Sequence, residues 1–154
     1  MFTLLRNSAF LGLLFLISAP VLWAQEEVKV IKASIKAAEG KEPGSQLLTL
    51  TLHIASPFHI YANPVGLEDL ENVQTTVKVS GKTALKSVKV DYPKGKLVKD
   101  KLVGDHSIYE GKVEIPIKVI RAEGDKGPLE VLIKFQACDE KRCLLPSSVK
   151  VELK

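Results

Sequence analysis

Apolar and polar residues alternate along most of the chain beyond residue 27, which is the pattern of β-strands with one buried and one exposed face. The two clearest runs have apolar residues at every second position: Leu48, Leu50, Leu52 and Ile54, and then Val113, Ile115, Ile117 and Val119. Shorter runs cover residues 28–36, 73–79, 88–90, 129–135 and 149–153. Roughly seven or eight short strands without a convincing helix predict an all-β fold, an antiparallel β-sandwich.

Irregularities in this pattern predict local departures from regular strands. The phase of the alternation slips near Ile31, which predicts a β-bulge in the first strand. Pro116 interrupts its run on the face opposite the four apolar residues, and a proline there predicts an edge strand or a bulge. Residues 91–111 form the longest stretch without alternation, so we expect a long loop, and loops of this length are often functional.

The first 24 residues have the composition of a signal peptide. Arg6 supplies a positive charge, residues 9–23 are almost entirely apolar, and Ala24 is a small residue before a charged segment. The apolar run of 15 residues is shorter than the roughly 20 that span a membrane. We therefore predict cleavage after Ala24 and a single periplasmic or otherwise extracytoplasmic domain over residues 25–154. Leu22 fits a cleavage site poorly, so an uncleaved N-terminal anchor is the alternative.

The distribution of charges and histidines excludes several functional classes. The net charge is +4, but the lysines are spread over nearly every strand, which is typical of a solvated surface and not of a nucleic-acid or membrane patch. No glycine-rich phosphate loop or nucleophile elbow occurs, and no cofactor is predicted. The spacings of His53, His59 and His106 match no familiar zinc pattern, so no metal is predicted.

The two cysteines, Cys138 and Cys143, lie between two predicted strands and are separated by four charged residues. A disulfide that closes so small a ring contributes only about 2 kcal/mol through chain entropy, so it stabilises the fold little. The pair is better suited to a redox couple in a solvated loop, where Lys141 and Arg142 favour a thiolate at Cys143. An inert disulfide that holds a loop remains the alternative.

The residues around the cysteines resemble the redox segment of the amino-terminal periplasmic domain of the thiol:disulfide interchange protein DsbD. The matching residues flank the pair as Phe135-Gln136-Ala137-Cys138 and Cys143-Leu144-Leu145-Pro146. Three upstream segments fit the same family in the same order: Phe58-His59-Ile60-Tyr61-Ala62-Asn63-Pro64, Asp91-Tyr92-Pro93, and Ile108-Tyr109-Glu110-Gly111 running into Val113-Glu114-Ile115-Pro116. The resemblance extends over approximately residues 28–153.

This resemblance implies an immunoglobulin-like sandwich and roles for particular residues. It implies that Cys143 forms the mixed disulfide with a partner and that Cys138 resolves it. It also implies a loop that caps the cysteines, which here consists of Asp100, Leu102, Val103 and Gly104 with Lys101. The family often has an aromatic residue where this chain has Leu102 and Val103. Side chains near the redox site are expected to be Tyr61, Tyr109, Gln136 and Pro146.

The predicted function is that of a secreted thiol–disulfide exchange module, which passes reducing equivalents between proteins through Cys138 and Cys143. Its reaction is a redox exchange between proteins rather than small-molecule catalysis. The expected partners are thioredoxin-like or other thiol–disulfide proteins of the cell envelope, including a separate membrane electron donor. Two other classes stay open, an immunoglobulin-like binding module and an envelope structural protein, each with an inert loop disulfide.

Overall fold

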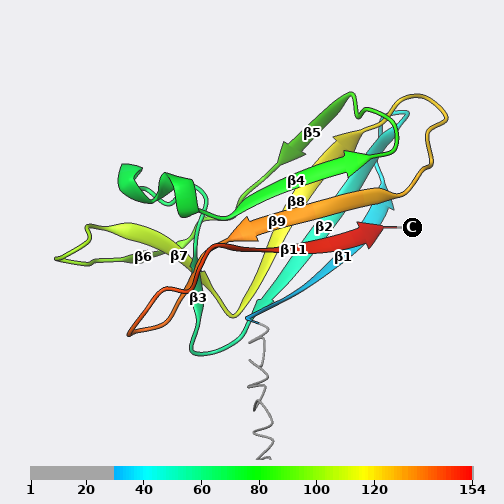
Figure 1. Ribbon diagram of the computed structural model, residues 1–154. Helices are drawn as coiled ribbons and strands as arrows, with labels where there is room; N and C mark the ends of the chain where they lie inside the picture. The colour runs from blue at the N-terminus through cyan, green and yellow to red at the C-terminus, as the bar shows by residue number, and fades with distance from the viewer. Residues whose placement is uncertain (1–29, 154) are drawn as a thin grey trace, which may run out of the picture.

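The computed structural model describes residues 30–153, which form a β-sandwich with a small additional sheet at one end (Figure 1). One layer has the strand order β1-β2-β8-β5, made of β1 (Ile31–Glu39), β2 (Ser45–Ile54), β8 (Lys112–Ile120) and β5 (Ser87–Val90). The other layer has the order β11-β9-β4, made of β11 (Ser147–Leu153), β9 (Leu129–Phe135) and β4 (Thr76–Gly81). The neighbouring strands pair antiparallel, which confirms the predicted fold class. The predicted leader, residues 1–24, lies outside the described residues.

The small sheet extends one end of the sandwich (Figure 1). Its order is β10-β3-β7-β6, made of β10 (Ala137–Cys138), β3 (His59–Tyr61), β7 (His106–Glu110) and β6 (Lys96–Val98). A short 3₁₀ helix, η1 (Glu68–Val73), follows β3 in sequence. Strand β9 leads through Gln136 directly into β10, and β7 leads through Gly111 into β8. The small sheet is therefore a continuation of strands that are already anchored in the sandwich.

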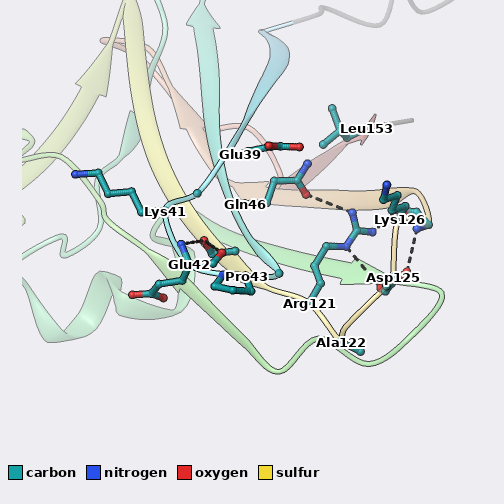
Figure 2. A pocket seen from close by; sticks show the side chains of 15 residues that line it. Glu39, Lys41, Glu42, Pro43, Gln46, Arg121, Ala122, Asp125, Lys126 and Leu153 are labelled. Atoms are coloured by element: carbon teal, nitrogen blue, oxygen red, sulfur yellow. Dashed lines mark hydrogen bonds and ion pairs between the residues drawn. The ribbon is translucent and has the colours of Figure 1, made fainter.

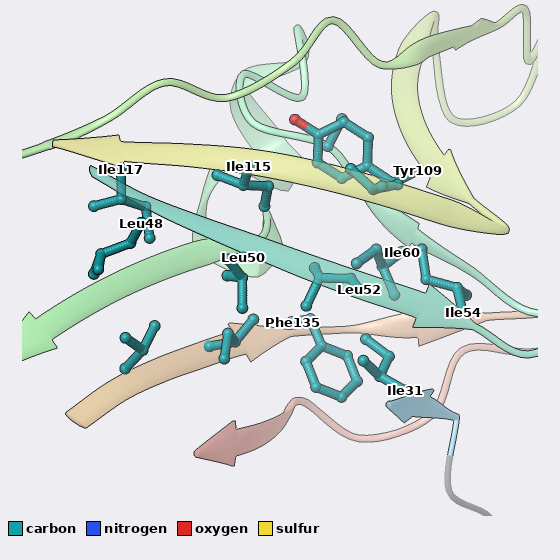
Figure 3. Close-up of a cluster of buried hydrophobic side chains, with 14 of the residues drawn as sticks. Ile31, Leu48, Leu50, Leu52, Ile54, Ile60, Tyr109, Ile115, Ile117 and Phe135 are labelled. Atoms are coloured by element: carbon teal, nitrogen blue, oxygen red, sulfur yellow. The ribbon is translucent and has the colours of Figure 1, made fainter. Parts of the chain in front are cut away.

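The alternation seen in the sequence places one face of each long strand in the core (Figure 3). Side chains from both layers are completely buried there, among them Leu50, Leu52, Ile115, Val131 and Ile133. His53, on the alternate face of β2, is exposed. Fully burying one such aliphatic side chain contributes about 1.5–3 kcal/mol, so this apolar interior is the main source of stability.

Two details of the predicted strands are wrong. The pairing of β1 with β2 runs without interruption from Ile31↔Ile54 to Glu39↔Gln46, so there is no bulge within β1. Strand β8, which contains Pro116, is interior and not an edge, since it pairs with both β2 and β5. The Pro116 carbonyl accepts a hydrogen bond from Asp91 N, just past the end of β5. The N and C=O groups of one strand residue point to the same side of the strand, so the nitrogen of Pro116 also faces β5. Pairing with β5 stops at Ile117, so the missing N–H of Pro116 costs no hydrogen bond of the sheet.

The stretch over residues 91–111 is not an irregular loop, because it contains the hairpin of β6 and β7. The run expected over residues 73–79 is also shorter than predicted. Val73 ends η1, and β4 begins only at Thr76. Around the small sheet, tertiary packing therefore decides where helix and strand begin and end, and the alternation of apolar and polar residues does not. Among residues 30–153, no helix is long and apolar enough to cross a membrane.

Candidate redox site

The small sheet has two chemically different faces, because successive side chains of a strand point to opposite sides. Ala137, Ile60 and Tyr109 are aligned across β10, β3 and β7, and all three belong to the main core. Cys138, opposite His59, lies on the other face together with Tyr61. This second face forms a smaller apolar cluster of Tyr61, Val65, Ile108 and Cys138. The disulfide therefore sits on a sheet whose reverse side is fixed in the core.

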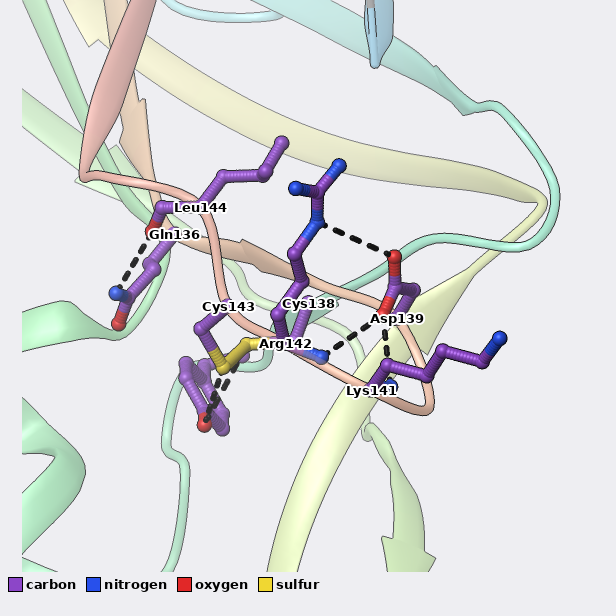
Figure 4. The surroundings of a disulfide bond; sticks show 8 residues. Gln136, Cys138, Asp139, Lys141, Arg142, Cys143 and Leu144 are labelled. Atoms are coloured by element: carbon purple, nitrogen blue, oxygen red, sulfur yellow. Dashed lines mark hydrogen bonds and ion pairs between the residues drawn. A yellow bond between two sulfur atoms is a disulfide. The ribbon is translucent and has the colours of Figure 1, made fainter.

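The two cysteines are disulfide-bonded across a tight turn (Figure 4). Backbone hydrogen bonds flank the pair, from Leu144 N to Ala137 O at 2.8 Å and from Asp139 N to Arg142 O at 2.9 Å. The Asp139 carboxylate accepts the backbone N–H groups of Lys141 and Arg142 at 2.7 and 2.9 Å. These hydrogen bonds, that from Lys141 first, lower the pKa of Asp139. Local hydrogen bonds thus fix the turn that joins the two cysteines.

The two cysteine residues differ sharply in exposure. Cys138 is only 3% exposed, whereas Cys143 is exposed. The Gln136 amide Nε2 donates to Leu144 O at 2.9 Å, which ties the residue after Cys143 to the end of β9. Pro146, the other flanking residue of the predicted site, is exposed and precedes β11. Cys143 is therefore the more open of the two residues to a thiolate from solvent.

The hydroxyl of Tyr61 contacts both sulfurs, at 3.6 Å from Cys138 Sγ and 3.7 Å from Cys143 Sγ. A disulfide sulfur carries no hydrogen, so the phenol is the donor. Burial raises the pKa of Tyr61, and the negative charge of Asp100 raises it further. The phenol therefore stays protonated, and it can donate a hydrogen bond to a thiolate when the disulfide is reduced.

Tyr109 was expected beside the redox site, but the structure separates it from Tyr61. Its side chain is 3% exposed and belongs to the main core. Its hydroxyl donates to Pro93 O at 2.7 Å and lies 3.1 Å from Asn63 O. Burial raises the pKa of Tyr109. This tyrosine stabilises the connections on either side of the small sheet and does not contact sulfur.

The predicted cap, residues 100–104, is the turn between β6 and β7. The Asp100 carboxylate accepts the backbone N–H groups of Leu102 and Val103 at 2.7 and 3.0 Å, and these bonds lower the pKa of Asp100. The Gly104 carbonyl accepts a hydrogen bond from Nδ1 of His106 at 2.8 Å. Leu102 is 97% exposed. The covering contact expected of Leu102 is therefore absent from this conformation, because the turn directs the side chain into solvent.

Two histidines, His59 and His106, flank Tyr61, although their spacing in the sequence predicted no metal site. The ring of His106 lies 5.7 Å from that of Tyr61, and the ring of His59 lies 6.5 Å from it, both edge-on. His59 and Tyr61 are two residues apart, so the period of a strand was the available signal that they share a face. Among residues 30–153, no group of three or more His, Cys, Asp or Glu side chains is arranged to hold a metal ion.

A cavity of about 690 Å³ lies at the opposite end of the sandwich, between the turn before β2 and the segment after β8 (Figure 2). Its polar centre is Arg121, whose guanidinium donates to Gln46 Oε1 at 3.3 Å and to Gly127 O. The Asp125 carboxylate lies 3.5 Å from Arg121 Nε. These charges are engaged with the protein itself, so they stabilise two loops, and the cavity contains no residue of the disulfide site.

Comparison with known proteins identifies the family. The family "Thiol:disulfide interchange protein DsbD, N-terminal" matches residues 25–154. The chain belongs to this family. No curated protein sequence matches the chain.

Two solved structures are similar to this chain in fold. One is the N-terminal periplasmic domain of ScsB from Proteus mirabilis, with a TM-score of 0.60 and 15% identity over 80% of this chain. The chain spans 45% of that ScsB chain. The other is the reduced DsbD N-terminal domain of Neisseria meningitidis, with a TM-score of 0.51 and 16% identity, covering 81% of this chain and 85% of that chain. The fold is accordingly an immunoglobulin-like β-sandwich.

Proposed function

We propose that this protein is a thiol–disulfide exchange module that passes reducing equivalents between partner proteins through Cys138 and Cys143. The observation that carries the proposal is the unequal exposure of a disulfide in a domain of the DsbD N-terminal family, with Cys143 exposed and Cys138 only 3% exposed. A purely structural disulfide does not require that its two cysteines differ in exposure. An exchange couple needs one sulfur that a partner can attack and one that only its neighbour can attack.

The roles of the two cysteines follow from this asymmetry. A partner thiolate attacks Cys143 Sγ, the Cys138–Cys143 bond breaks, and Cys138 leaves as a thiolate. In the opposite direction, the Cys143 thiolate attacks a partner disulfide, and Cys138 then attacks Cys143 Sγ and releases the partner as a dithiol. The Tyr61 hydroxyl, which contacts both sulfurs, stabilises the thiolate on either one.

The surface around Cys143 supports docking of a partner protein. Three apolar side chains near the small sheet are strongly exposed: Leu102 at 97%, Val103 at 52% and Leu145 at 85%. Leu102 and Val103 are neighbours in the turn between β6 and β7, and Leu145 follows Cys143 by two residues. Exposed apolar side chains can belong to interaction surfaces. We infer that they form the rim on which a thioredoxin-like protein of the cell envelope docks, and that a separate membrane protein supplies the electrons. The extracytoplasmic location follows from the predicted leader and from the persistence of a disulfide there.

Trapping with single-cysteine variants tests this proposal. Cys138→Ser should accumulate a mixed disulfide with a thioredoxin-like protein whose resolving cysteine has been removed, and Cys143→Ser should accumulate little. Equal or better trapping by Cys143→Ser would reverse the two roles. The reduction potential, measured by equilibration with a thiol–disulfide buffer, should lie above about −300 mV. A lower potential would instead identify an inert disulfide in a binding or structural module.

A further inference from the structure

Four side chains form a row across the small sheet and end at the disulfide. The register aligns Glu110 with His59, His59 with Cys138, and Cys138 with Cys143. Residues directly opposite one another in antiparallel strands point to the same face, with Cβ atoms about 4.5–5.5 Å apart. His59 therefore stands between Glu110 and Cys138 in the register, on the same face of the sheet. This is the order in which carboxylate, imidazole and thiol are arranged where an imidazole activates a thiol.

The surroundings of His59 favour the neutral imidazole. The pKa of His59 is lowered, first by its partial burial and then by the neighbouring His106. The charged groups that face it from the other elements are Glu110 on β7 and Asp139 after β10, which raise the pKa, and Lys96 on β6, which lowers it. The Glu110 carboxylate is itself held by Lys96 Nζ at 2.6 Å. A neutral imidazole has a free lone pair and can accept a proton at neutral pH.

Cys138 needs a proton acceptor when it acts as the resolving residue. The attacking species is the thiolate, and at 3% exposure Cys138 is shielded from water that could take its proton. Tyr61 is the nearest hydroxyl, at 3.6 Å, but burial raises its pKa, so it is a donor and not an acceptor. His59 is the titratable residue directly opposite Cys138 in the register.

We propose that His59 accepts the thiol proton of Cys138 when Cys138 resolves the mixed disulfide, with Glu110 stabilising the imidazolium that forms. This inference rests on the exchange function proposed above. The proton moves from Cys138 Sγ to His59, and the thiolate attacks Cys143 Sγ. The Cys138–Cys143 bond forms, the bond between Cys143 and the partner breaks, and the partner cysteine leaves as a thiolate with the electron pair. His59 then releases the proton to water.

The two steps can be timed separately with 5,5′-dithiobis(2-nitrobenzoate). One equivalent mixed with the reduced full chain releases a first thionitrobenzoate when Cys143 attacks and a second when Cys138 resolves. The leaving group needs no proton, so the second phase reports the activation of Cys138. His59→Gln should slow the second phase about 100-fold at neutral pH and leave the first phase nearly unchanged. The wild-type resolving rate should level off above the pKa of His59, whereas the variant's rate should keep rising with pH, because hydroxide must then remove the Cys138 proton.

Two further variants make the result specific. Glu110→Gln keeps the imidazole but removes a charge that raises its pKa, so the acid limb of the second phase should move to lower pH. His53→Gln, on the exposed face of β2, should behave as wild type in both phases. A normal first phase with an unchanged second phase and pH profile in folded His59→Gln would overturn the role of His59. A missing first phase in the wild type would instead overturn the exchange function itself.

Discussion

The Tyr61 hydroxyl lies within 3.6 Å of Cys138 Sγ and 3.7 Å of Cys143 Sγ, so a single phenol contacts both ends of the disulfide. We expect Tyr61→Phe to slow alkylation of the reduced protein by iodoacetamide at neutral pH by about threefold to tenfold. Loss of a hydrogen bond to a charged group, which contributes about 1.5–3 kcal/mol, lowers the fraction of thiolate and therefore the rate. The remaining thiolate is more nucleophilic, which offsets part of that loss.

Tyr109→Phe is the matched control for that experiment. Its hydroxyl lies against the carbonyls of Pro93 and Asn63 and does not contact sulfur. We expect this variant to lose about 1–2 kcal/mol of unfolding free energy in urea with no change in the alkylation rate. Equal alkylation rates in Tyr61→Phe and wild type would show that the phenol does not stabilise the thiolate.

Removal of both cysteines should leave the fold intact. The disulfide closes a small ring in the end sheet, and Cys138 packs in the smaller cluster, apart from the leucines and isoleucines of the main core. The Cys138→Ala, Cys143→Ala protein should therefore lose about 2 kcal/mol in chemical unfolding and keep its far-UV circular dichroism. A variant that is unfolded at room temperature would show that the bridge is structural, which is contrary to the exchange function.

Leu102 should matter for a protein partner but not for a small reductant. Because the side chain is 97% exposed and does not cover the sulfurs, Leu102→Ser should be reduced by dithiothreitol at the wild-type rate. Its exchange with a thioredoxin-like protein should be severalfold slower, because an apolar contact at the docking rim is lost. Leu47→Ser, at another exposed apolar position, is the control for general surface effects. Faster reduction of Leu102→Ser by dithiothreitol would indicate that the turn closes over the disulfide in solution.

The leader is expected to be removed on export, so that the mature protein begins at Gln25. Trp23 is the only tryptophan of the chain, and the mature protein should show tyrosine-type fluorescence alone. Intact mass spectrometry of exported protein shows directly whether residues 1–24 have been removed. A mass that retains residues 1–24 would instead support an uncleaved N-terminal anchor.

Much of this architecture could be predicted from local pattern. The strand period of two assigns Leu48, Leu50 and Leu52 to one face of β2 whatever the neighbouring strands are, since a shift by one residue would expose all of them. The spacing of Cys138 and Cys143 and the charged residues between them likewise predicted a solvated disulfide turn. Such features depend only on residues close together in the chain.

Other features were decided by which strands pair, and in which register. Pro116 is tolerated in an interior strand because β5 ends beside it, and no sequence pattern in β8 records the length of β5. His59 lies opposite Cys138 only because β3 pairs with β10, although nearly eighty residues separate them. Leu102 points outward because of a turn held by Asp100. Pairing between distant strands follows from the packing of the whole sandwich, so the chemistry beside the sulfurs became visible only in three dimensions.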